Sequence, residues 1–390
     1  MGHNGGMQLR TVPLSDVTVA GALDLDHTDQ GVVVRRLPAW TRHQLTDLLL
    51  ATMVTMPAGV RLEFETDSPE LEIDVMLTLL QMVGRPLRPA AFDLTVDGTV
   101  TSSVESDVGT RILYDAVTRA IEFQPGEPTT LRFRPVASGG MARVEVWLPH
   151  ASIVALKELR VAEGSEIRPM AAARPTWVHY GSSISHCMES PTPTGTWPAI
   201  AARRSGVALH NLAFAGQCML DQVVARTIRD TPADYISIKA GINVVNGDTM
   251  RERTYVPALH GFLDTVRDGH PRTPIALVTP IICPAAEDHP GPTVPGSDDR
   301  YGVVTRPPEL WEGALTLRRI RALSSEVVEA RRRYGDLNLH LMDGLSLFGE
   351  SDTADLYDGL HPNAEGYRRM GARFAQLAFS AGGPFADRSG

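Results

Sequence analysis

Lysine is scarce in this 390-residue sequence, and positive charge nowhere gathers into a stripe or a block. Lys157 and Lys239 are the only lysines among 37 basic residues, and 46 acidic residues leave a formal net charge of −9. Nucleic acids and anionic membrane surfaces attract basic patches, so neither is an expected partner.

Cysteine is equally scarce, and no metal-ligand spacing is present. Cys187, Cys218 and Cys283 are odd in number and far apart, which excludes a disulfide framework and a Cys-x-x-Cys pair. The twelve histidines show neither His-x-His nor His-Glu-x-x-His spacing. The sequence therefore predicts no metal site and no other cofactor.

Long apolar runs are also missing. None approaches a membrane span, and the start at Met1 lacks the apolar core of a signal peptide. With 43% hydrophobic and 21% charged residues, the chain has a globular composition and a length sufficient for two domains. We expect a reduced, cytoplasmic protein.

Residues 1–161 are predicted to form a β-sandwich domain. Short segments there alternate apolar and polar residues, as half-buried strands do, at 60–66, 71–77, 91–96, 119–123, 131–134, 143–148 and 153–159. Asp97-Gly98 and Gly139-Gly140 indicate turns. Many short strands with such turns are typical of an antiparallel, jelly-roll-like sandwich. Residues 41–53 are Leu-rich and fit a helix or a strand equally well.

The pattern changes after a connector at 162–175, which is small, polar and interrupted by two prolines. Over 176–390, short apolar strands alternate with helical stretches, and this alternation predicts a parallel sheet with helices on both faces. The expected strands are 177–180, 207–212, 235–238, 275–279 and 337–342, and the expected helices are 196–204, 220–229, 251–267, 310–333 and 363–378. The Pro-, Gly- and Asp-rich segment 284–308 is expected to be a loop, either a lid or mobile filler.

A serine turn follows the first of these strands, in the stretch Tyr180-Gly181-Ser182-Ser183. Small residues there allow a sharp turn that would present the Ser183 hydroxyl at the carboxyl edge of the sheet, where such folds bind ligands. A serine nucleophile needs a base and an oxyanion site. Taken alone, the turn is more simply an ordinary one.

Asp358 and His361 supply a candidate base with its acid. They are three residues apart on a loop that Pro362 turns into the last helix. This spacing lets the carboxylate accept from imidazole Nδ1 while Nε2 faces outward, as a serine nucleophile requires. A loop aspartate beside a helix-capping histidine is the alternative.

Gly216 and Asn243 follow the second and third predicted strands. The Gly216 N–H, the Asn243 amide and the Ser183 N–H would together offer three donors to an oxyanion. Individually, a turn glycine and a turn asparagine are the simpler interpretations. His186 either lines the same site or supports the turn, and Lys239 is expected to be an ion-paired strand end.

In this order Ser183, Gly216, Asn243 and Asp358-x-x-His361 resemble the SGNH (GDSL-like) hydrolase family, over about 176–379. The resemblance implies a three-layer αβα flavodoxin-like fold, with Ser183 as nucleophile, His361 as base and Asp358 as orienting acid. It also implies that Ser183, Gly216 and Asn243 form the oxyanion hole. The strands upstream resemble the β-sandwich that precedes the hydrolase domain in some bacterial esterases of this family.

Two positions depart from the family pattern. Its Gly-Asp-Ser is Gly181-Ser182-Ser183 here, and its Gly-x-Asn-Asp ends in Val244. Neither removes a group of the implied triad or oxyanion hole. The α/β-hydrolase fold also presents a nucleophilic serine on a turn after a strand, but it requires the motif Gly-x-Ser-x-Gly. Ser185 occupies the position of the second glycine, so this fold is rejected.

The expected function is a serine esterase that cleaves an ester of a sugar or small alcohol, with a short acyl group such as acetyl. Two alternatives remain at this point. One is an acyltransferase that uses the same acyl-enzyme, and the other is a catalytically lapsed glycan-binding protein. The sequence indicates no oligomeric state.

Overall fold

The computed structural model describes residues 8–115, 118, 120–135, 140–170, 174–296 and 300–386, and they form two compact units. The first unit comprises Met1–Pro38, Val54–Ala173 and Pro191–Thr194, and the second comprises Ala39–Met53, Arg174–Ser190 and Gly195–Gly390. Two short segments therefore belong to a different unit from their neighbours in sequence. Gly139 of the predicted Gly139-Gly140 turn lies outside the described residues.

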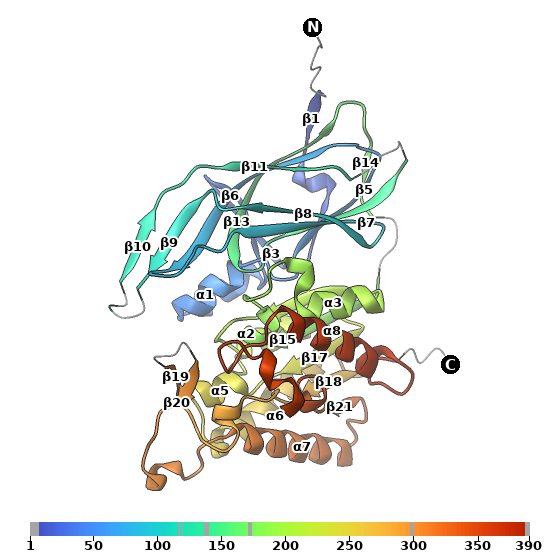
Figure 1. Ribbon diagram of the computed structural model, residues 1–390. Coiled ribbons are helices and arrows are strands. Elements are labelled where there is room, and N and C mark those ends of the chain that lie inside the picture. The colour runs from blue at the N-terminus through green and yellow to red at the C-terminus, as the bar shows by residue number, and fades with distance from the viewer. Residues whose placement is uncertain are drawn as a thin grey trace. The chain divides into compact units, whose positions relative to one another are not determined.

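The first unit is a sandwich of two sheets, as predicted (Figure 1). One sheet has the order β10-β9-β6-β13-β4-β3, with β1 on β13 and β11 on β6. Its strands are β1 Leu9–Val12, β3 Asp24–Thr28, β4 Gly31–Arg35, β6 Leu71–Met82, β9 Thr110–Tyr114, β10 Ile121–Gln124, β11 Thr129–Phe133 and β13 Ser152–Ala162.

The other sheet has the order β14-β5-β12-β7-β8, with β2 on β5. Its strands are β2 Thr18–Ala20, β5 Arg61–Thr66, β7 Ala90–Val96, β8 Thr99–Ser106, β12 Ala142–Trp147 and β14 Ile167–Arg168. Asp97 and Gly98 connect β7 to β8, as the sequence predicted. The expectation of a wholly antiparallel sandwich is wrong at one place, because β6 and β9 pair in parallel.

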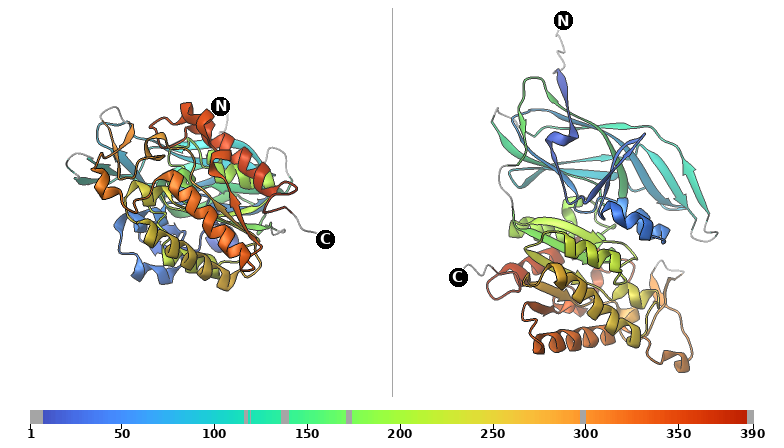
Figure 2. Two further views of the ribbon diagram at one scale, coloured as in Figure 1. Left: turned by 90° about the horizontal axis from the view of Figure 1, so that it is seen from below. Right: turned by 180° about the vertical axis from the view of Figure 1, so that it is seen from behind.

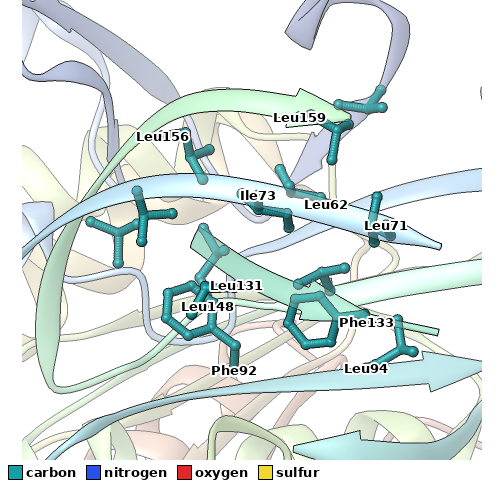
Figure 3. Close-up of a cluster of buried hydrophobic side chains, with 14 of the residues drawn as sticks. Leu62, Leu71, Ile73, Phe92, Leu94, Leu131, Phe133, Leu148, Leu156 and Leu159 are labelled. Carbon is teal, nitrogen blue, oxygen red and sulfur yellow. The ribbon is translucent and has the colours of Figure 1, made fainter. Parts of the chain in front are cut away.

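Apolar side chains from both sheets fill the space between them. Figure 3 shows Ile73 of β6 and Phe92 of β7 on opposite sides of this core. Both side chains are at most 1% exposed. Burial of such side chains, spaced two residues apart along each strand, is the main stabilising contribution to a sandwich.

The second unit is a five-stranded parallel sheet in the order β16-β15-β17-β18-β21. Its strands are β15 Thr176–Gly181, β16 Ala208–Ala213, β17 Tyr235–Lys239, β18 Ile275–Val278 and β21 Leu339–Met342. All five strands were predicted, and their order is the flavodoxin-like 2-1-3-4-5. The first strand therefore lies between the second and the third, which decides the geometry of the site.

Helices cover both faces of this sheet. They are α2 Ser183–His186, α3 Trp197–Ser205, α4 Gln222–Asp230, α5 Ile242–Asn246, α6 Glu252–Gly269, α7 Leu317–Arg333 and α8 Ala364–Phe379. Trp177 of β15 stacks on Phe374 of α8, and Tyr180 of the same strand stacks on Phe262 of α6. Successive side chains of a strand point to opposite faces, so α8 and α6 cover different faces. The right-hand view of Figure 2, from behind, shows the helices on the α6 face of this sheet, with yellow α6 beside orange α7.

The segment 41–53, which fitted a helix or a strand equally well in the sequence, is mostly helical, with a 3₁₀ turn at Ala39–Gln44 and α1 at Leu48–Thr55. Three other segments differ from the sequence-based expectations. The connector 162–175 contributes β14 to the sandwich, because Ile167 and Arg168 pair with β5. The loop 284–308 contains a hairpin of β19 Thr293–Pro295 and β20 Tyr301–Val303. The helix expected from residue 310 begins at Leu317, where the Thr316 hydroxyl accepts from the Arg319 N–H and caps it.

Within the described ranges no helix combines the length and apolar character needed to cross a membrane.

Candidate active site

Ser183 lies at the first position of α2, immediately past the carboxyl end of β15. The turn is tight, because a Cβ at Gly181 would be 2.5 Å from Ser185 Oγ. Only glycine fits there, so the small residues recognised in the sequence do permit the sharp turn. The Ser183 side chain is half-buried, and its backbone N–H donates to no described residue.

The structure brings Ser183 together with His361 and Asp358. Ser183 Oγ is 2.9 Å from His361 Nε2, and His361 Nδ1 is 2.7 Å from Asp358 Oδ2. The other carboxylate oxygen, Oδ1, accepts from the backbone N–H groups of Leu360 and His361 at 2.9 and 2.7 Å. Asp358 is thus fixed by its own loop, and it fixes the imidazole tautomer that leaves Nε2 to face the serine.

The charges of this chain of hydrogen bonds suit proton transfer. Burial disfavours the charged form of Asp358, but the hydrogen bonds from His361 outweigh it and lower the pKa of Asp358. Burial likewise disfavours the imidazolium, but the charge of Glu189 and then the contact with Asp358 raise the pKa of His361 above its ordinary value. His361 is therefore a stronger base than a free histidine.

Gly216 and Asn243 lie on either side of Ser183, because β16 and β17 flank β15 in the sheet. Gly216 has a φ of +73°, which favours glycine, and its N–H donates to no described residue. Asn243 Oδ1 accepts from the Cys218 N–H at 3.0 Å, so its Nδ2 group is the end left to donate. The three groups that the sequence predicts as oxyanion donors thus follow three adjacent strands at the carboxyl edge of the sheet.

The remaining candidates have structural roles in the site. His186 is buried, and its Nδ1 accepts from the Ala215 N–H at 3.3 Å, so it supports the loop that carries Gly216. The expectation of an ion-paired Lys239 is wrong. Lys239 is 1% exposed, its Nζ contacts no hydrogen-bonding or acidic partner among the described residues, and burial lowers its pKa to about 8.

Two contacts of the site have no sequence signal. Tyr301, in the hairpin of the loop 284–308, lies edge-on to the His361 ring at 5.9 Å, and its N–H donates to the Asp358 carbonyl at 2.7 Å. Glu189, whose charge acts on His361, accepts from the Tyr367 hydroxyl at 2.9 Å. Both lie far in sequence from His361, so only the fold reveals them. In the described part of the chain, no group of three or more His, Cys, Asp or Glu side chains could hold a metal ion.

A comparison with models of protein families gives one match in each unit. Residues 179–369 match the GDSL-like lipase/acylhydrolase family, and residues 17–157 match the N-terminal domain of SsfX3. A search of curated proteins found no match.

Solved structures agree with this division. The salicylyl-acyltransferase SsfX3 from a tetracycline biosynthetic pathway is 27% identical, with a TM-score of 0.78 over 95% of this chain and 96% of that one. A protein of Bacteroides ovatus described as a GDSL-like lipase is 19% identical, with a TM-score of 0.66 over 94% and 96%. The acetyl xylan esterase Est2A of Butyrivibrio proteoclasticus is 11% identical, with a TM-score of 0.54 over 95% and 98%, and shares the fold. Residues 179–369 therefore form a domain of the GDSL-like lipase/acylhydrolase family, and residues 17–157 form an N-terminal domain of the SsfX3 type.

Proposed function

We propose that this protein is a serine esterase that cleaves a carbohydrate or small-molecule ester through an acyl-enzyme on Ser183. The observation that carries the proposal is the continuous chain from Ser183 Oγ through His361 to Asp358, at 2.9 and 2.7 Å. The alternative, a loop aspartate beside a helix-capping histidine, does not account for the contact between His361 and a serine 178 residues away.

In the first half of the reaction, His361 Nε2 takes the proton from Ser183 Oγ, which attacks the ester carbonyl carbon. The carbonyl oxygen becomes an oxyanion that accepts from the N–H groups of Ser183 and Gly216 and from Asn243 Nδ2. The C–O bond to the alcohol then breaks, and His361 gives its proton to the leaving oxygen. Asp358 stays ionised and stabilises the imidazolium throughout.

In the second half, a water molecule takes the place of the alcohol. His361 accepts a proton from this water, whose oxygen attacks the acyl carbon, and the Ser183 Oγ–acyl bond breaks as the proton returns to Oγ. The products are one carboxylic acid and one alcohol per ester. No step requires a metal or an organic cofactor.

An activated serine is tested by intact mass after exposure to a fluorophosphonate. We expect one adduct on the wild-type protein and none on Ser183→Ala or His361→Ala. Absence of an adduct on the wild-type protein, under conditions that label a known serine esterase, would contradict the proposal. Glycan binding without turnover of any ester would then favour a lapsed enzyme.

An acyltransferase is the second candidate, and it is supported by the 27% identity to a salicylyl-acyltransferase over nearly the full length of both chains. The acyl-enzyme would be the same, with an acceptor alcohol in place of water. Supplying candidate alcohols and measuring the new ester against the free acid decides between the two. Acyl product in excess of free acid would favour transfer.

A further inference from the structure

The segment Ala39–Met53 lies between the sandwich strands β4 and β5 in the sequence, but it packs within the second unit. The Arg226 guanidinium of α4 lies over the Trp40 ring, 4.6 Å from its centroid, and also donates to Gln44 Oε1. These contacts hold the segment against α4, whose amino end follows the Gly216 loop. The segment is thus anchored beside the candidate site.

The first turn of α1 exposes apolar side chains. Asp47 Oδ1 accepts from the Leu50 N–H at 2.8 Å and starts the helix. Leu50 is buried, at 4% exposure, whereas Leu48 is 76% exposed and Leu49 is 48% exposed. Two adjacent leucines therefore face away from the protein interior, where a helix surface is usually polar.

Leu49 lies against the oxyanion loop. Its Cδ2 atom is 3.8 Å from the point that a Cβ of Gly216 would occupy, which is ordinary van der Waals distance. A carbonyl oxygen bound to the Gly216 N–H lies about 3 Å from that nitrogen. The group attached to that carbonyl is then within reach of the Leu49 methyls.

The two substituents of the ester carbonyl have different neighbours. The leaving oxygen must come within hydrogen-bond reach of His361 Nε2 to receive its proton, and Tyr301 borders that imidazole. The alcohol therefore occupies the His361 side. The acyl substituent is left with the opposite side, where Gly216 and Leu49 lie.

We infer that Leu49, with the exposed Leu48 beside it on α1, forms an apolar surface that binds the acyl group of the substrate and favours an alkyl or aryl acyl group longer than acetyl. This inference rests on the proposed function and names its substrate class. The leucines act by covering apolar substrate surface, since each buried methylene contributes to binding in proportion to its area. The sequence analysis expected a short acyl group such as acetyl, and this inference predicts a larger acyl group instead.

The test compares acyl chain lengths at a constant leaving group. kcat/KM is measured for 4-nitrophenyl acetate, butyrate, hexanoate and benzoate with the wild-type protein and Leu49→Ala. We expect the hexanoate-to-acetate ratio of kcat/KM to fall roughly tenfold in Leu49→Ala, with little change for acetate. Leu337→Ala is the matched control, because Leu337 is 63% exposed and precedes β21, at the opposite edge of the sheet.

Two results would overturn the acyl surface. Equal losses on acetate and hexanoate would mean that Leu49 only supports the Gly216 loop. The second result is an effect of Leu49→Ala on kcat/KM that differs among acetate esters of phenol, 1-naphthol and 4-nitrophenol. It would mean that Leu49 contacts the alcohol and not the acyl group. Fluorophosphonate labelling of Leu49→Ala at the wild-type rate verifies that the variant is folded and its serine is activated.

The same data separate this inference from the proposed function. A wild-type protein that forms no adduct and turns over no ester overturns the proposed function and, with it, the acyl surface. A wild-type protein that turns over both esters, beside an unchanged chain-length ratio in Leu49→Ala, overturns the acyl surface alone.

Discussion

Partly buried charges in the sandwich pair with one another, whereas polar groups at the carboxyl edge of the parallel sheet are left for a ligand. In the sandwich, Arg160 contacts Glu72 and Asp74 at 2.9 and 2.7 Å, and hydrogen bonds from arginines lower the pKa of both carboxyls. At the sheet edge, the N–H groups of Ser183 and Gly216 bond to no described residue. A balanced pair stabilises a fold, and an unused donor is available for chemistry.

The difference predicts that changes at the sheet edge remove activity and changes in the sandwich core remove stability. Five predictions can break or sharpen this contrast, and they follow in decreasing order of expected effect.

Ser183→Ala should lower kcat by about 10⁶-fold, about 8 kcal/mol, because no other group forms the acyl-enzyme. Its unfolding transition should stay close to that of the wild-type protein, since the Ser183 side chain is only half-buried. Steady-state kinetics and denaturant unfolding measure the two effects. Ser325→Ala, on the exposed side of α7, is the control. Near-normal turnover by Ser183→Ala would refute the nucleophile.

Phe92→Ala should lower the free energy of unfolding of the sandwich by about 3–5 kcal/mol, because the fully buried ring leaves a cavity. Urea unfolding followed by tryptophan fluorescence measures it. Phe123, which is 67% exposed on β10, is the matched control, and Phe123→Ala should change stability by less than about 0.5 kcal/mol. Equal effects of the two substitutions would contradict the assigned core.

Asn243→Ala should lower kcat by about 10²–10³-fold, as expected when one oxyanion donor is lost. KM should change much less, because the donor acts mainly on the charge that develops in the transition state. Asn338→Ala is the control, since the Asn338 amide donates to the Arg272 carbonyl at the far edge of the sheet. A loss confined to KM would mean that Asn243 binds substrate without stabilising the oxyanion.

The acid limb of kcat/KM should be centred above the ordinary pKa of histidine, about 6.5, because His361 must be neutral to accept the serine proton and its pKa is raised. Activity is therefore lost as pH falls through this raised value. The contribution of the protonated His361 to stability runs the opposite way. It is fully present below the unfolded-state pKa and is lost as pH rises through the folded-state pKa.

Glu189→Gln should move that midpoint to lower pH, because it removes the negative charge that favours the imidazolium. Asp230→Asn, at the far end of α4, removes one charge from a distant place and should leave the midpoint unchanged. A midpoint unaffected by Glu189→Gln would leave Asp358 as the source of the raised pKa.

Many elements of both units could be predicted from local patterns. Alternation with period two marked the strands of the sandwich, and the switch to strand-helix alternation marked the parallel sheet, because side-chain period depends on backbone geometry alone. The pair Asp358 and His361 was also within reach, since three residues on one loop suffice to bring carboxylate and imidazole together. Strands β1 to β4, β8 and β9 were not predicted: five of them span only three to five residues, and β8 has two apolar residues, Val100 and Val104, among eight.

The sequence by itself determined which residues could perform the chemistry and which strands carry them. Only the tertiary structure decided that Ser183 and His361 meet across 178 residues, and that β15 lies between the strands leading to Gly216 and Asn243. It also decided that Leu49 reaches Gly216 and that Tyr301 reaches His361. Local periodicity states which face of an element is buried. It does not state which other element that face packs against, because this is decided by contacts between elements that are distant in the chain.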